Sequence, residues 1–137
     1  MHTPEPISGT ILVIGSDSRL PDEKTALEKA GFSVITAGTA ADGLALARER
    51  QPDLVISDVM LEKADAGFVL SYQMKADPAL AEVPLILLSS AFQQTGISFD
   101  LNSPEGRQWI KADLYIDRPV TPERLVGKVR GLLLHRQ

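Results

Sequence analysis

Short apolar runs alternate with longer segments of helical spacing along nearly the whole chain. The apolar runs predict strands at residues 11–14, 33–37, 53–58, 85–88 and 114–116. The segments between these strands predict helices at residues 21–30, 39–51, 67–76 and 103–111, and a last helix that opens at Thr121. The last helix has one apolar face, because Leu125, Val129, Leu132 and Leu133 recur at the spacing of helical turns.

Strands that alternate with helices in this way indicate a parallel sheet that is covered by helices on both faces. We therefore predict a single α/β domain over residues 8–136, preceded by a polar tail at residues 1–7. Right-handed crossover connections place the carboxyl ends of all the strands at one edge of such a sheet. Ligands of open α/β sheets bind outside this edge, so residues that directly follow the strands are the candidates for chemistry.

The third predicted strand ends in an acid, Asp58, after the apolar-rich residues 54–57, which indicate a strand too buried to carry a charge. The residues that follow the other strands are Gly15-Ser16-Asp17, Ser89-Ser90 and Asp117-Arg118. A carboxylate, a hydroxyl and a cation that converge at one edge suit phosphoryl chemistry. The carboxylate can attack phosphorus, the hydroxyl can bond a phosphoryl oxygen, and the cation can offset its charge.

The composition tells against several classes of function. The chain has 137 residues and no cysteine, so it has neither disulfides nor thiolate chemistry. Its only histidines are His2 and His135, near the two ends, which makes a histidine zinc site or a Ser-His hydrolase a poor candidate. The net charge of -4 argues against a nucleic-acid surface. No apolar run approaches the roughly 18 residues of a membrane span, and the polar N-terminus lacks the apolar core of a signal peptide. We therefore expect a cytoplasmic protein that binds neither nucleic acid nor membrane.

Several stretches resemble, in order and spacing, the receiver domain of two-component response regulators over nearly the whole chain. The matching stretches are residues 11–14, 30–34, 52–61, 75–80 and 83–89, of which 52–61 is the sharpest. The resemblance implies a flavodoxin-like α/β fold, a doubly wound sheet of five parallel strands in the order 2-1-3-4-5 with helices on both faces. It also implies a signalling module of a phosphorelay rather than an enzyme.

The resemblance assigns roles to residues at the strand ends. It makes Asp58 the phosphoacceptor that receives a phosphoryl group from a histidine kinase. It implies that Ser89 contacts that group, that Tyr115 is the switch aromatic, and that Arg118 stands where the family has a charge-neutralising lysine. In the family, Mg2+ is held by two acids after the first strand, by the acceptor, and by a backbone carbonyl that corresponds to Met60. A histidine kinase or a downstream effector would bind the face of the fourth helix, fifth strand and fifth helix.

The chain departs from the family pattern at the metal site. The acid pair aligns with Gly15 and Ser16, which have no carboxylate, while Asp17 lies one residue further on. Asp17 is either a replacement ligand or a helper at the N-terminus of the first helix. Mg2+ usually relies on one or two carboxylates together with water, so we expect it to bind weakly or not at all. Arg118 keeps the charge of a lysine but presents it as a rigid fork.

Three further side chains have two interpretations each. Arg118 either pairs directly with Asp58, as a standing imitation of the neutralised state, or points to solvent. Ser89 is either a switching hydroxyl or a plain strand-end hydroxyl. Tyr115 is either the switch aromatic or a half-buried packing residue.

Two hypotheses of different class compete for the function. In the first, which the degenerate metal site favours, the protein is a pseudo-receiver that binds a protein partner without phosphate. In the second, it is a working Mg2+-dependent phosphoacceptor. A flavin- or nucleotide-binding domain of the same fold is a remote third hypothesis, because no glycine-rich phosphate loop follows the first strand. No effector domain is expected before the chain ends at Gln137, so we expect it to pass its signal through an interaction surface, unless the chain is a fragment of a longer protein. The polar segment 93–102 would become ordered only against a partner.

Overall fold

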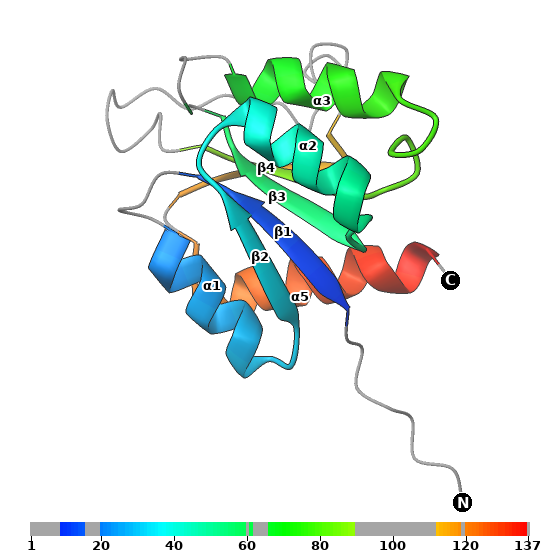
Figure 1. The fold of residues 1–137 in the computed structure, drawn as a ribbon. Helices are drawn as coiled ribbons and strands as arrows, with labels where there is room; N and C mark the ends of the chain where they lie inside the picture. The colour runs from blue at the N-terminus through cyan, green and yellow to red at the C-terminus, as the bar shows by residue number, and fades with distance from the viewer. Residues whose placement is uncertain are drawn as a thin grey trace, which may run out of the picture.

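The computed structural model describes residues 9–15, 20–59, 61, 66–89, 112–118 and 120–136, without the side chains of 20–22, 117, 135 and 136. The strands are β1 (Thr10–Ile14), β2 (Ser33–Ala37), β3 (Leu54–Asp58), β4 (Leu85–Ser89) and β5 (Leu114–Asp117). The helices are α1 (Leu20–Lys29), α2 (Ala40–Arg50), α3 (Ala66–Ala76) and α5 (Pro122–Arg136) (Figure 1). These elements confirm the predicted strands and four of the predicted helices. The helix expected at 103–111, the segment 93–102 and the tail at 1–7 lie outside the described residues.

The five strands form one parallel sheet in the order β2-β1-β3-β4-β5, which confirms the expected topology. Helices α2 and α3 cover one face of this sheet, and α1 and α5 cover the other face (Figure 1). Because every pair of neighbouring strands is parallel, the strands all end at the same edge of the sheet. The side-chain direction of each strand-end residue is then set by the alternation of the strand.

Alternate residues of the strands belong to two separate cores. The core under α2 and α3 takes its strand residues from Leu12, Ile14, Ala37, Val55, Leu85, Leu87 and Tyr115. The core under α1 and α5 takes them from Ile11, Val13, Leu54, Ile56, Ile86, Leu88 and Ile116. Burying one such aliphatic side chain contributes about 1.5–3 kcal/mol to the free energy of unfolding. Among the described residues, no helix is long and apolar enough to cross a membrane.

Local signals in the sequence account for the ends of α2. The side chain of Thr39 accepts a hydrogen bond from the backbone N–H of Asp42 at 3.1 Å, as its place before the helix predicts. Gln51 ends the helix in the left-handed conformation, with φ 47°. The third strand begins at Leu54 rather than at residue 53. The carboxylate of Asp53, just before it, accepts a hydrogen bond from the backbone N–H of Thr10 at 2.8 Å.

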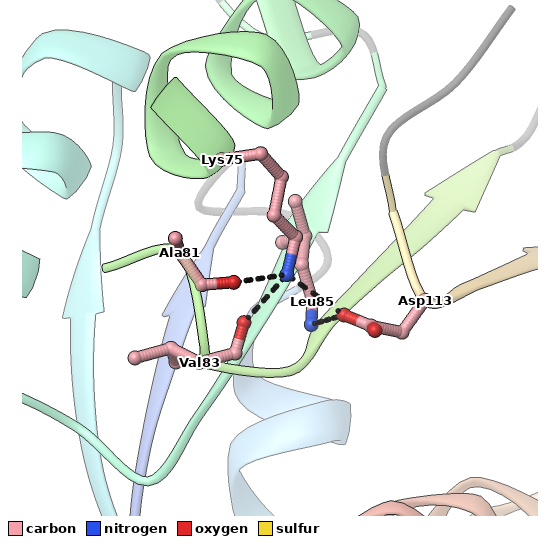
Figure 2. A network of polar contacts seen from close by, with 5 residues as sticks. All are labelled: Lys75, Ala81, Val83, Leu85 and Asp113. Atoms are coloured by element: carbon pink, nitrogen blue, oxygen red, sulfur yellow. Dashed lines mark hydrogen bonds and ion pairs between the residues drawn. The ribbon is translucent and has the colours of Figure 1, made fainter. Parts of the chain in front are cut away.

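A polar network joins α3 to the opposite edge of the sheet, where β4 and β5 begin (Figure 2). The ammonium of Lys75 donates to the backbone carbonyls of Ala81 and Val83, at 3.3 and 2.9 Å. It also pairs with Asp113 Oδ2 at 3.1 Å, and the same oxygen accepts the backbone N–H of Leu85 at 2.7 Å. The network therefore holds the start of β5 against the start of β4, and it fixes the register that carries Arg118 to the far edge.

Replacing Lys75 with methionine is expected to lower the free energy of unfolding by about 1–2 kcal/mol, because one carboxylate and two carbonyls lose a charged donor. Urea unfolding followed by circular dichroism measures the change. The matched control is Lys24→Met on the exposed part of α1, where we expect a change within about 0.5 kcal/mol. Equal stability of the two variants would show that the network contributes nothing.

Candidate functional site

Asp58 is the last residue of β3 and is almost fully buried, with 2% of its surface exposed. Its neighbour two residues back, Ile56, belongs to the core under α1 and α5, so the alternation of the strand directs Asp58 to that face. The backbone at this point is fixed by a hydrogen bond from Val59 N–H to the carbonyl of Leu88 at 2.9 Å. The carboxylate is therefore held at the sheet edge, on the side of α1 and α5.

Arg118 follows β5 directly and lies on the same face as Asp58, two residues beyond Ile116. Its backbone N–H donates to the carbonyl of Ser89 at 2.7 Å, which extends the pairing of β4 with β5 by one residue. From this position its Nη2 donates to Asp58 Oδ1 at 2.5 Å. Of the two interpretations of Arg118, the structure shows the pair with Asp58 and not a side chain that points to solvent.

The same Nη2 of Arg118 also donates to Oε1 of Glu23, which comes from α1. Glu23 and Arg118 each have 11% of the side-chain surface exposed. The cluster of Glu23, Asp58 and Arg118 carries two negative charges and one positive charge, and thus a net charge of -1 when all three are ionised. We call these three residues the cation clamp.

The environment of Arg118 keeps its guanidinium ionised. Burial by itself lowers the pKa of Arg118, but the charges of Glu23 and Asp58 and their hydrogen bonds outweigh the burial. The pKa of Arg118 therefore lies above the ordinary value of an arginine, and the positive charge beside Asp58 is permanent.

Two other residues singled out from the sequence lie on the opposite face. Tyr115 is 4% exposed and belongs to the core under α2 and α3, so it is more deeply buried than a half-buried packing residue. Ser89, also 4% exposed, follows Leu87 by two residues and is directed by alternation to the same face as Tyr115. The structure thus brings Asp58 and Arg118 together and separates them by the thickness of the sheet from Tyr115.

The donor set around Asp58 does not fit a divalent cation in the part of the chain that the structure describes. Mg2+ prefers several oxygen ligands in octahedral geometry, whereas Asp58 Oδ1 is bound to a guanidinium. Gly15, at the end of β1, has no side-chain donor, and no group of three or more His, Cys, Asp or Glu among the described residues could hold a metal. Asp17 and Met60, the other predicted ligands, lie outside the described residues.

Gly67 explains how α3 packs against the carboxyl end of β3. Its backbone N–H donates to the carbonyl of Val59 at 2.8 Å. A Cβ at position 67 would contact the carbonyl oxygen of Asp58 and come within 2.6 Å of the Cα of Val59. Only glycine allows this approach, so Gly67 helps to set the backbone that carries Asp58.

Glu23 is the site residue that the sequence analysis missed. It stands in the first turn of α1, where an acid is most simply explained by the helix dipole. A position one helical turn before the buried Leu27 was the one available signal. That spacing predicts a side chain on the inner face of α1, but it does not predict the partner that the side chain meets there.

Comparisons with known proteins show which family the sequence of this chain matches. Residues 22–130 match the family model of the response regulator receiver domain. The transcriptional regulator RpaA of Synechocystis is 35% identical over 126 residues, which are 90% of this chain and 48% of that protein. The protein PilH of Pseudomonas aeruginosa is 30% identical over 107 residues, which are 78% of this chain and 82% of that protein. The chain spans about half the length of the first curated relatives.

Solved structures agree with the sequence comparison. The receiver domain of a histidine kinase from Syntrophus aciditrophicus superimposes with a TM-score of 0.76 at 27% identity, covering 93% of this chain and 91% of that one. The chemotaxis response regulator CheY4 of Vibrio cholerae also has a TM-score of 0.76, at 22% identity, covering 92% of this chain and 99% of that one. At this lower identity the likeness to CheY4 concerns the fold alone.

Proposed function

This chain belongs to the response regulator receiver family, and from that premise we propose that it is a pseudo-receiver that acts through protein contacts without phosphorylation. In this proposal Asp58 keeps the phosphoacceptor position, but Arg118 already neutralises it. The proposal rests on one observation, the contact of 2.5 Å between Arg118 Nη2 and the buried Asp58 Oδ1. We further propose that residues 8–136 fold as a single unit.

The electrostatics of the cation clamp support this proposal. Oδ1 of Asp58 is engaged in a short charge-assisted hydrogen bond and would have to leave the guanidinium of Arg118 before it could attack phosphorus. A phosphoryl donor is itself an anion and would approach a cluster of net charge -1. Without a divalent cation to offset that charge, we expect the approach and the attack to be slow.

The burial of Tyr115 also supports a surface of β5 and α5 that does not change its conformation. A switch aromatic must change its environment when the acceptor changes state. Tyr115 is 4% exposed among the apolar residues under α2 and α3, so a rotation would open a cavity in that core. We therefore propose that Tyr115 is a packing residue and that the surface of β5 and α5 is presented constitutively.

Response regulators interact with histidine kinases and effector domains, and we propose a protein partner of this kind for the surface of β5 and α5. The name of RpaA describes DNA binding for that protein, of which this chain matches 48%. The net charge of -4 favours a protein over a nucleic acid as the partner of this chain.

The test of the proposed function is reaction with acetyl phosphate in the presence of MgCl2, followed by intact-protein mass spectrometry. We expect no phosphoryl adduct, and we expect beryllofluoride to leave the amide NMR signals of Asp58 and Ser89 unchanged. Asp58→Asn is the control for adducts at other residues. A stoichiometric adduct that Asp58→Asn abolishes would overturn the proposal.

A working phosphoacceptor remains the second candidate function, and one contact favours it. The backbone bond from Arg118 to Ser89 keeps the guanidinium and the Ser89 hydroxyl at the ends of neighbouring strands. In this alternative the guanidinium would turn from Asp58 to an attached phosphoryl group, and the Ser89 hydroxyl, which the strand alternation directs to the other face, would have to turn around the end of its strand to contact the same group. In this alternative Asp17, Asp58 and Met60 would supply the Mg2+ ligands, and the acetyl phosphate experiment would give an adduct.

A further inference from the structure

We propose that Glu23 is a positioning residue that locks the guanidinium of Arg118 onto Asp58 and so keeps small phosphoryl donors from reacting there. The inference rests on the proposed function and deepens it, because it names the residue that makes the acceptor unreactive. Glu23 lies on a helix, outside the strand-end residues from which the site was predicted. It acts on Asp58 through Arg118.

The cation clamp joins three separate elements of the fold. Glu23 comes from α1, Asp58 from the end of β3, and Arg118 from the residue after β5. Both carboxylates accept from the same nitrogen, Nη2. To follow an incoming phosphoryl group, the guanidinium must therefore leave two charged acceptors rather than one.

Glu23 is held in place by the packing of its own helix. One turn later on the same face of α1, Leu27 is fully buried in the core under α1 and α5. Helix α1 also contacts α5 and β2. The carboxylate of Glu23 thus approaches Arg118 from a fixed support, in contrast to Glu28 of the same helix, which is exposed.

Removing the charge of Glu23 changes two quantities at once. The net charge of the clamp rises from -1 to zero, which lessens the repulsion of an anionic donor. The guanidinium also loses one of its two acceptors and becomes able to turn toward a phosphoryl oxygen. Each effect raises the reactivity of Asp58, whereas a purely structural role of Glu23 predicts lower stability and no gain of reaction.

The experiment compares the wild-type chain with Glu23→Gln and with the matched control Glu28→Gln, each treated with acetyl phosphate and MgCl2. In the reaction an oxygen of Asp58 bonds to phosphorus, the phosphorus–oxygen bond to the acetyl group breaks, and acetate leaves. Wild type should stay below the limit of detection, and Glu23→Gln should form the adduct at a rate at least about tenfold above that limit, as for removal of a like charge worth about 1.4 kcal/mol. Glu28→Gln should behave as wild type, and Asp58→Asn combined with Glu23→Gln should form no adduct.

The outcomes separate the two proposals. If wild type and Glu23→Gln are equally silent, the proposed function stands and the role of Glu23 is refuted. If wild type reacts readily, the proposed function fails; the role of Glu23 then survives only if Glu23→Gln is still about tenfold faster.

If Glu23→Gln folds poorly, a measurement on the wild-type chain still tests the inference. Side-chain nitrogen NMR should show restricted rotation of the Arg118 guanidinium, and a freely rotating guanidinium would contradict the proposal that Glu23 holds it in place.

Discussion

Replacing Arg118 with methionine is expected to lower the free energy of unfolding by about 3 kcal/mol, near the low end of the range for a broken buried ion pair. The substitution leaves the carboxylates of Asp58 and Glu23 facing each other without a cation, and Asp58 is 2% exposed. The loss stays near the low end because water reaches Glu23, which is 11% exposed. Urea unfolding at pH 7 measures the change.

Two controls test whether the loss comes from unpaired charge. Arg124→Met, on the exposed side of α5, should change the free energy of unfolding by no more than about 0.5 kcal/mol. Asp58→Asn in the Arg118→Met background should recover most of the loss, because one of the two carboxylates is then neutral. MgCl2 should raise the melting temperature of Arg118→Met but not of wild type. If Arg118→Met is as stable as Arg124→Met, the cation clamp does not stabilise the fold.

Replacing Gly67 with alanine is expected to destabilise the protein by about 2–3 kcal/mol, in the range for overpacking of a tight core. The added Cβ meets the backbone of Asp58 and Val59, which cannot move aside as a flexible side chain would. Thermal and urea unfolding measure the loss. Amide NMR should show the largest shifts at Asp58 and Val59, since α3 must retreat from the end of β3.

The opposite sign is expected for Gly127→Ala in α5, which is the matched control. Nothing lies within 4 Å of a Cβ at position 127, and alanine favours an exposed helix by about 0.5–1 kcal/mol over glycine. If Gly127→Ala stabilises the protein and Gly67→Ala destabilises it, the loss at position 67 comes from the contact of α3 with the backbone of Asp58 and Val59, and not from the helix propensity of alanine. A Gly67→Ala variant as stable as wild type would mean that α3 does not pack as described.

The sequence by itself determined the five strands, four of the helices and the edge of the sheet at which the strand-end residues lie. Apolar runs with a strand period predict β1 to β5, Thr39 marks the start of α2, and the resemblance to receivers predicts the strand order. These properties depend on residues close in the chain, because alternation and capping are local effects. The placement of Asp58 at the edge of the sheet follows from the same pattern.

Only the tertiary structure decided what Asp58 meets. Glu23 and Arg118 are 95 positions apart, and Arg118 and Asp58 are 60 apart. Lys75 and Asp113, which hold the other edge, are 38 apart. No local pattern encodes such pairs, because they arise where separately formed helices and strands pack together. Asp58 is engaged by Arg118 because the packing of α1 and the pairing of β5 bring Glu23 and Arg118 to the same edge of the sheet.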